Sequence, residues 1–234
     1  MRPRISVVMP VYNQAHLISN AIASIVRQTI SDWELIIVDD GSVDAWKLKM
    51  LVDKFEDERI KLYTQNEHRG MVSTRNFGNS LATADIIALQ DADDLSMPDR
   101  LEKILEHIGD NDVLYHGLYM NTWSERWNCI DRSYGKALPI DIERLKKEQY
   151  IPGVCAFKKE LWNRKPFRLE TQFSFDWMMH LDWVLSGAKY KCLDIGLYEY
   201  VRHTNSASQR FERSGERMQS ISAMREIIKN EYES

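Results

Sequence analysis

The first half of the chain alternates short runs of β-branched residues with segments of helical periodicity. Residues 5–11, 33–38, 60–64 and 85–90 predict strands, and residues 15–27, 44–55 and 72–81 carry apolar side chains at helical spacing. This alternation is typical of βαβ units and a parallel sheet. The run Ile86-Ile87-Ala88-Leu89 is apolar on both faces, which indicates a central strand covered on both sides. The sequence therefore predicts an α/β fold with a mostly parallel, Rossmann-like central sheet flanked by helices.

The second half of the chain is less regular. Residues 97–108, 140–149 and 175–186 predict helices, residues 113–120 and 154–157 predict strands, and residues 190–201 predict one or two strands. Residues 124–135 are expected to form a loop, and residues 123–135 are a candidate lid over a bound ligand. The last stretch, residues 212–229, places Met218, Ile221, Arg225 and Ile228 on one helical stripe, which we expect to pack against the body of the protein.

Length and charge limit the class of protein. With 234 residues, 44% of them hydrophobic, the chain suits one α/β domain, 1–234. Its net charge of −4 argues against a generally basic nucleic-acid binder. Residues 1–110 hold 12 basic and 18 acidic side chains, whereas the remainder is slightly basic. The basic residues between Lys136 and Arg168 form either a solvated surface or a face that attracts an anion.

No run approaches the roughly 18 consecutive apolar residues that span a bilayer, and no apolar signal region follows Met1. The expected location is cytoplasmic, either free or peripherally attached at the inner membrane face. Cys129, Cys155 and Cys192 are odd in number and widely spaced, which favours free thiols over disulfides or a zinc site.

Polar residues follow four of the predicted strands or their connections, and ligands of open parallel sheets bind at the carboxyl ends of the strands. These segments are Pro10-Val11-Tyr12-Asn13, Asp39-Asp40-Gly41-Ser42, His68-Arg69-Gly70 and Asp91-Ala92-Asp93-Asp94. The second segment alone also fits a tight turn with a helix cap. Three carboxylates crowded at the end of one strand imply a cation or a dense hydrogen-bond network. Oxygen ligands favour Mg²⁺ or Mn²⁺, held together with substrate phosphates.

These residues, in this order and spacing, resemble the family 2 glycosyltransferases with the GT-A fold of nucleotide-diphospho-sugar transferases. The resemblance covers roughly residues 4–208 and includes the strand-end segments above, Arg75-Asn76-Phe77-Gly78 and Met97-Pro98-Asp99-Arg100-Leu101. It implies a hexosyltransferase-type enzyme that moves a sugar from a nucleotide-diphosphate donor to an acceptor hydroxyl. It also divides the chain into a nucleotide-sugar-binding half (1–110), an acceptor-binding half (111–208) and a C-terminal helix (209–234).

The resemblance implies a role for each residue of the donor side. Base, ribose and diphosphate would be bound by Pro10, Tyr12, Asp39, Asp40, Arg75 and the DXD motif Asp91-Ala92-Asp93. Asp40 would contact the base, and an acidic residue there favours an imide base and hence a UDP-sugar. Asp91 would serve the ribose and the metal, Mn²⁺ or Mg²⁺, and Asp93 would be the firmer metal ligand. His203 would be either a third metal ligand or a structural residue.

The acceptor side matches the family pattern less closely. Phe175-Asp176 stands where such enzymes carry Glu-Asp, and Asp182 and Val201 stand where they carry Arg. Inverting transfer requires a carboxylate that takes the proton of the acceptor hydroxyl, and Asp176 is the candidate general base, with Asp182 in reserve. Apolar neighbours of Asp176 (Phe173, Phe175 and Trp177) are expected to raise its pKa. Most tryptophans of the second half are expected in the core.

Several alternatives remain open. A nucleotidyltransferase is disfavoured because Tyr12-Asn13-Gln14-Ala15 is not a Gly-rich, basic loop. Phe175 in place of Glu permits a non-catalytic module that binds a sugar nucleotide or a glycan. The acceptor is expected to be a glycan or another hydroxyl compound, as in polysaccharide biosynthesis, but the basic segment also permits an anionic acceptor such as modified DNA. Oligomeric state is not predicted.

Overall fold

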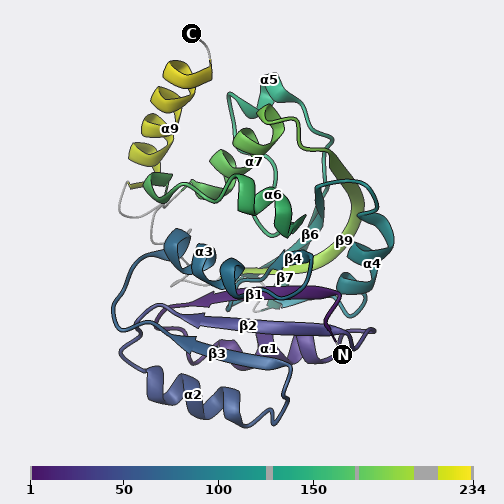
Figure 1. Ribbon diagram of the computed structural model, residues 1–234, viewed down its shortest axis with the longest axis vertical. Coiled ribbons are helices and arrows are strands. Elements are labelled where there is room, and N and C mark those ends of the chain that lie inside the picture. Colours follow the sequence, from purple (N-terminus) through teal and green to yellow (C-terminus); the bar gives the residue numbers. More distant parts are fainter. Residues whose placement is uncertain (1, 125–128, 172–173, 203–215, 233–234) are drawn as a thin grey trace.

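A computed structural model describes residues 2–124, 129–171, 174–202 and 216–232, and within these ranges nine strands form one sheet (Figure 1). Its strand order is β3 (Ile60–Thr64), β2 (Trp33–Asp39), β1 (Ile5–Val11), β4 (Ile86–Leu89), β8 (Ala156–Lys158), β6 (Val113–Ser124), β9 (Tyr190–Arg202) and β5 (Leu95–Ser96), with β7 (Cys129–Gly135) pairing with β6. Strands β1 to β4 are mutually parallel, and the remaining part mixes both directions. The prediction of an α/β sheet flanked by helices is confirmed.

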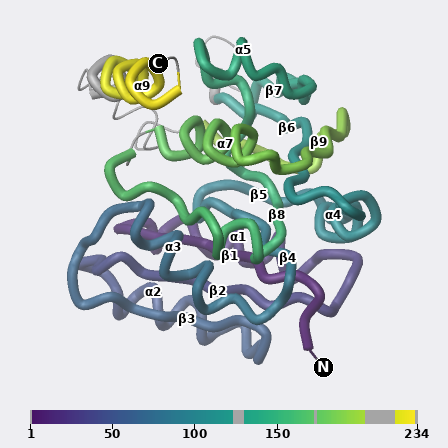
Figure 2. Tube along the Cα trace, turned by 45° about the horizontal axis from the view of Figure 1, so that its top comes forward, coloured from purple at the N-terminus to yellow at the C-terminus, as the bar shows by residue number. Residues whose placement is uncertain are grey.

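Side chains of the parallel strands alternate between two apolar layers, as the two-residue period of a strand requires. On β1, Val7 and Met9 pack with α1 (Ile18–Val26), α2 (Ala45–Asp53) and α4 (Arg100–His107). Val8 faces the opposite layer, which contains α3 (Met71–Leu81) and the helices of the second half. In Figure 2 the helices of the second half lie above β1 and β4, and α3 lies beside β1. The central strand β4 is covered on both faces, as predicted.

The second half of the chain builds the upper layer in Figure 1 from α5 (Ile142–Leu145), α6 (Lys159–Arg164), the 3-10 turn Leu169–Thr171 and α7 (Phe175–Leu185). Trp177 and Trp183 are 2% and 1% exposed, so the described tryptophans of α7 lie in the core. The Trp183 ring packs against Phe157 of β8 with centroids 4.9 Å apart. This aromatic core fixes α7 over the end of the sheet.

Several boundaries in the second half were predicted wrongly. Residues 124–135 are not a loop throughout, because β7 pairs with β6 and extends β6 to residue 124. The residues of this hairpin are mostly polar, so its pairing could not be predicted from apolar periodicity. The predicted helix 140–149 is only the short α5, and β5 and α6 were not predicted. Residues 190–202 form one strand, whose register against β6 shifts at Gly117.

The C-terminal helix α9 (Glu216–Tyr232) packs against the body, as predicted. Its buried stripe is formed by Ile221, Met224 and Ile228, whereas Arg225 is exposed, so the predicted stripe was wrong at Arg225. The side chain of Met218 lies outside the described residues. None of the helices within the described ranges has the length and apolar character needed to cross a membrane. Cys155 and Cys192 are free thiols.

Candidate active site

The carboxyl ends of β1 and β2 lie side by side because the strands are parallel neighbours. Pro10 pairs with Val38 and Val11 with Asp39, and the N–H of Asp40 donates to the carbonyl of Val11 at 2.9 Å. Pro10 is partly buried in β1. β4 lies on the other side of β1, so its end reaches the same edge. The structure therefore brings the predicted donor-side segments together.

A tight turn after β2 is tied to the loop after β1. The N–H of Ser42 donates to Asp39 Oδ1 at 3.1 Å, and Gly41 has a φ of +72°. The N–H of Asn13 donates to Ser42 Oγ at 2.8 Å, and the N–H of Val43 donates to Asn13 Oδ1 at 2.9 Å. Asp39 is fully buried, and its Oδ2 has no hydrogen-bond partner. The end of β2 thus forms a tight turn and also holds a buried carboxylate oxygen of Asp39 that has no hydrogen-bond partner.

Asp40 is buried beneath the loop between β3 and α3. Its Oδ1 accepts from the N–H of Arg69 at 2.8 Å, and its Oδ2 accepts from the N–H of Gly70 at 3.0 Å. His68 Nδ1 lies 2.8 Å from the same Oδ2. The His68 ring is stacked on Tyr12, with centroids 3.9 Å apart. This arrangement joins three of the four predicted strand-end segments.

Arg75 and Asp91 form a close ion pair. Arg75 Nη2 lies 2.5 Å from Asp91 Oδ1, and the Arg75 side chain is 4% exposed. The Phe175 ring lies under the guanidinium, 4.3 Å from Arg75 Cζ to the ring centroid. Arg75 Nε and Nη1 are buried and have no hydrogen-bond partner. Two donors of a buried cation are therefore available to an anionic ligand.

The carboxylates after β4 differ in their surroundings. Asp93 Oδ2 accepts from Gln14 Nε2 at 3.2 Å, which links this strand end to the loop after β1. The methyl group of Ala92 is buried in the apolar core. Asp94 is 1% exposed, its Oδ1 accepts from the N–H of Val201 at 2.8 Å, and its Oδ2 has no partner. Asp93 thus lies at the site, and Asp94 lies beneath it.

These carboxylates fit a divalent cation. Burial, followed by the charges of Asp91 and Asp93, raises the pKa of Asp94 well above its ordinary value. Excess negative charge of this kind is relieved by a bound cation. Within the described ranges no three His, Cys, Asp or Glu side chains could by themselves hold a metal ion. Mg²⁺ or Mn²⁺ held by one or two carboxylates together with a ligand's phosphates requires no such group. His203 lies outside the described residues.

Asp176 lies in the first turn of α7. Its Oδ1 accepts from the N–H of Trp177 at 3.0 Å, and its Oδ2 accepts from Gln149 Nε2. Gly153 approaches closely from a neighbouring loop, since a Cβ there would lie 2.8 Å from Asp176 Cβ. The N-cap position of α7 is occupied by Ser174, so Asp176 does not cap this helix.

The pKa of Asp176 is raised from 3.8 to about 6, chiefly by burial. Its hydrogen bond from the N–H of Trp177 and the charge of Arg75 lower the pKa, and the charge of Asp91 raises it further. The predicted direction is therefore confirmed. Asp176 directly follows Phe175, whose ring packs under the Arg75 guanidinium of the donor side. Phe173, one predicted neighbour, lies outside the described residues.

The carboxylate of Asp182, the reserve candidate, is bound by several side chains. Its carboxylate accepts two hydrogen bonds from Arg168, from Nε at 2.7 Å and from Nη2 at 2.8 Å. Tyr232 of α9 donates to the same carboxylate, and Lys165 Nζ lies 3.3 Å away. Asp182 is 2% exposed. Its oxygens are thus committed to fastening α9 to α7.

Acidic neighbours pair with much of the basic segment 136–168. These pairs are Lys136 with Asp194, Arg144 with Glu148, Lys146 with Glu143, and Arg168 with Asp182 and Glu231. Much of the charge that suggested an anion-attracting face is thereby compensated.

A buried polar network under the site was missed by the reading of the sequence. Arg100 is fully buried and donates to Gln90 Oε1 at 3.1 Å and to the carbonyl of Leu89 at 2.8 Å. Tyr198 Oη accepts from the N–H of Asp91 at 2.9 Å. Gln90, a polar residue closing an apolar strand, was the one local signal. The network holds the end of β4 in place.

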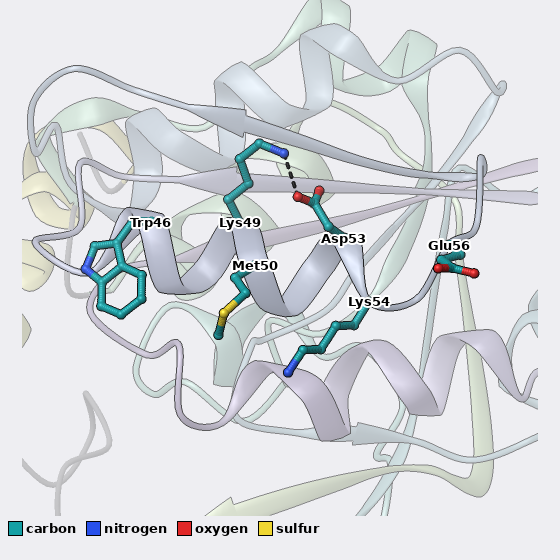
Figure 3. Close-up of a pocket in the computed structure, with 6 residues that line it drawn as sticks. All are labelled: Trp46, Lys49, Met50, Asp53, Lys54 and Glu56. Atoms are coloured by element: carbon teal, nitrogen blue, oxygen red, sulfur yellow. Dashed lines mark hydrogen bonds and ion pairs between the residues drawn. The ribbon is translucent and has the colours of Figure 1, made fainter.

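A surface hollow of about 420 Å³ lies elsewhere (Figure 3). It is lined by Trp46, Lys49, Met50, Asp53, Lys54 and Glu56, on or just after α2. Figure 3 shows these side chains along one exposed helix, with Lys49 and Asp53 paired. None of the predicted site residues lines it, so we do not assign the chemistry to it.

Comparisons with known proteins identify a family for this chain. The family model described as "Glycosyl transferase family 2" matches residues 6–168. The Escherichia coli UDP-Glc:alpha-D-GlcNAc-diphosphoundecaprenol beta-1,3-glucosyltransferase WfgD is 36% identical over 111 residues, which are 47% of this chain and 43% of that enzyme. The chain thus spans less than half of this curated relative.

Solved structures share the fold at low identity. S. aureus TarS 1-349 in complex with UDP-GlcNAc has a TM-score of 0.69 and 18% identity, covering 96% of this chain and 66% of that one. The mannosyltransferase PcManGT from Pyrobaculum calidifontis, in complex with GDP-Man and Mn²⁺, has a TM-score of 0.62 and 20% identity, covering 94% and 63%. The GT-A fold follows from these likenesses.

Proposed function

The chain belongs to glycosyl transferase family 2, and we propose that it transfers a sugar from a nucleotide-diphosphate donor, preferably a UDP-sugar, to an acceptor hydroxyl with inversion. One observation carries the proposal. The Arg75 guanidinium, paired with Asp91 at the carboxylate-rich end of β4, lies over the ring of Phe175, and Asp176 is the next residue of α7. Residues from both halves thereby meet, as a transfer between two substrates requires. We propose a single domain, 1–234, with a donor half and an acceptor half on one sheet.

The donor preference rests on the base side of the site. Asp40 is a buried carboxylate, which can accept a hydrogen bond from the imide N–H of uracil, and Tyr12 offers a ring face for stacking. Pro10 and Asp39 would complete the base and ribose side. TarS binds UDP-GlcNAc, and WfgD is named for UDP-Glc, which supports the same donor class here.

Arg75 is suited to the diphosphate. Its Nε and Nη1 donors are buried without a partner, while Nη2 is held by Asp91. A buried guanidinium with free donors binds a phosphate oxygen through charge-assisted hydrogen bonds. The stacked Phe175 ring prevents the guanidinium from swinging away. Arg75 would thereby orient the leaving group and exclude water from it.

Asp93 and Asp91 would hold the metal, Mn²⁺ or Mg²⁺, with Asp93 the firmer ligand as the family resemblance implies. Such a metal supplies Lewis-acid neutralisation of the departing diphosphate. PcManGT carries Mn²⁺ with its donor, which supports this cofactor class. His203 as a further ligand stays a prediction.

Asp176 is proposed as the general base. The acceptor O–H would pass its proton to the Asp176 carboxylate while the oxygen attacks the anomeric carbon, and the bond from that carbon to the diphosphate would break on the opposite face. A pKa of about 6 leaves the carboxylate mostly ionised near pH 7, yet basic enough to accept a proton. Gln149 and the N–H of Trp177 fix its orientation.

A second candidate rests on Phe175. The family pattern places Glu here, whereas this side chain is 6% exposed and packs under Arg75. Loss of that carboxylate would suit a module that binds a sugar nucleotide or glycan without turnover. An anionic acceptor is less favoured because much of the basic segment is ion-paired.

The test is release of nucleoside diphosphate from a panel of UDP- and GDP-sugars with Mn²⁺ or Mg²⁺, with and without acceptor glycans. Asp93→Asn is expected to lower turnover by at least about 100-fold, and the exposed Asp110→Asn is the matched control. Turnover that survives EDTA unchanged would exclude the metal. Donor binding without hydrolysis or transfer across the panel would favour the binding module.

A further inference from the structure

His68 occupies the place where the proposed function puts the donor base. Its imidazole lies against Tyr12, with ring centroids 3.9 Å apart and the planes 20° from parallel. Its Nδ1 lies 2.8 Å from Asp40 Oδ2. One flat ring therefore stacks on Tyr12 and points a nitrogen at Asp40. A uracil bound to these two residues would make the same two contacts.

The hydrogen-bonding capacity of Asp40 is filled while His68 is in place. Oδ1 accepts from the N–H of Arg69 and lies 3.5 Å from Gln65 Nε2. Oδ2 accepts from the N–H of Gly70 and from His68. Since the two backbone donors are fixed by the loop, His68 is the partner that a base can replace.

The backbone of this loop is closely packed. A Cβ on Gly41 would lie 2.7 Å from the carbonyl carbon of Glu67 and 2.8 Å from the nitrogen of His68. Because Gly41 has no Cβ, the loop backbone packs directly against the turn after β2. The His68 side chain, by contrast, is 51% exposed. Rotation of the imidazole into solvent needs no movement of the backbone.

We propose that His68 is an internal stand-in for the donor base, which closes the base site in the absence of donor and is displaced by the incoming nucleotide. The inference rests on the proposed function, because it requires a nucleotide base between Tyr12 and Asp40. It assigns His68 a competitive role. A residue that formed a wall of the base pocket would have the opposite effect on affinity.

The donor base can bind only in molecules whose base site is open. The apparent affinity for the donor is therefore the intrinsic affinity multiplied by the fraction of molecules with an open site. A ring stack and a hydrogen bond together keep the closed form several times more populated than the open form, so removing the imidazole is expected to lower the Kd of UDP about three- to tenfold.

The experiment is calorimetric titration of UDP, with GDP in parallel, into the wild type, His68→Ala and the exposed control His107→Ala in the presence of Mn²⁺. Tighter binding of UDP by His68→Ala alone supports the stand-in. Unchanged or weaker binding by His68→Ala, with binding by the wild type intact, overturns it and leaves the proposed function standing. If neither nucleotide binds to any of the three proteins, the proposed function fails and the inference with it.

A second readout needs no variant. Diethyl pyrocarbonate modifies accessible imidazoles, and the modification of each histidine can be followed by mass spectrometry. Saturating UDP is expected to increase modification of His68 at least about twofold relative to His107, because the ring stack and the hydrogen bond are released. Protection of His68 by UDP would mean that the imidazole covers the base and would overturn the inference.

Discussion

Asp176→Asn tests the chemistry and the electrostatics of the site together. A rise of the carboxyl pKa from 3.8 to about 6 means that the folded state binds the proton more tightly than the unfolded state does. This preference corresponds to about 3 kcal/mol at most. Because the side chain is half-buried and partly screened by solvent, we expect about 1–2 kcal/mol in practice.

The sign of the effect follows from the raised pKa. Protonated Asp176 stabilises the folded state below pH 4, and this contribution is lost as the pH rises through about 6. Asparagine does not ionise, so the variant does not lose stability as the pH rises through about 6. It has one oxygen, however, where the carboxylate accepts from both Gln149 and Trp177, so the variant loses a hydrogen bond worth about 1 kcal/mol at every pH.

Urea unfolding of the two proteins between pH 4 and pH 8 measures this balance. Asp176→Asn is expected to be less stable than the wild type by about 1 kcal/mol near pH 4. It should be as stable or more stable at pH 8, by up to about 1 kcal/mol. A stability difference that does not change with pH would refute the raised pKa.

The same variant is expected to lose turnover by about 10²–10⁴-fold while the Kd of UDP changes less than about twofold. Wild-type turnover should rise with pH through about 6 as the base ionises, and this rise should be absent from the residual activity of the variant. A variant that retains wild-type turnover would exclude Asp176 as the base.

Two further variants test the framework. Asp182→Ala removes the buried carboxylate that accepts from Arg168 and Tyr232, while Arg168 keeps its ion pair with Glu231, and should lower the free energy of unfolding by about 1.5–3 kcal/mol in urea titrations; a loss below about 1 kcal/mol would contradict the fastening of α9. Gly41→Ala places a methyl group 2.7 Å from the backbone of Glu67 and should weaken binding of UDP, whereas Gly109→Ala, also at positive φ but with nothing within 4 Å, should cost only about 1 kcal/mol of stability and no affinity. Equal UDP affinity in the two glycine variants would refute the packing argument.

Much of the donor half could be predicted from the sequence. Strands β1 and β3 begin and end where the β-branched runs do, and β4 is covered on both faces as its unbroken apolar run predicts. Parallel neighbours bring their carboxyl ends to one edge, so the residues after each strand meet once the βαβ pattern is recognised. The family resemblance added roles to positions that periodicity had already grouped.

Other features of the second half could not be predicted. Strand β7 forms because it pairs with β6, and β5 forms because it pairs with the distant β9. Neither segment has enough apolar periodicity to be predicted as a strand from the sequence. In the sequence Asp182 is a second candidate for the catalytic carboxylate. Only the structure shows that Arg168 and Tyr232 of α9 bind its oxygens.

The sequence by itself determined the sheet type, the strand ends and the residue types gathered there, because strand period and motif spacing are local properties of the chain. Tertiary structure decided which carboxylate is paired with an arginine, which is buried and which ring lies on Tyr12. Asp91 is held by Arg75, Asp176 gains its raised pKa from burial, and His68 reaches Asp40 from a separate loop. Charge and burial depend on neighbours that are close in space and distant along the chain, and only the folded protein supplies them.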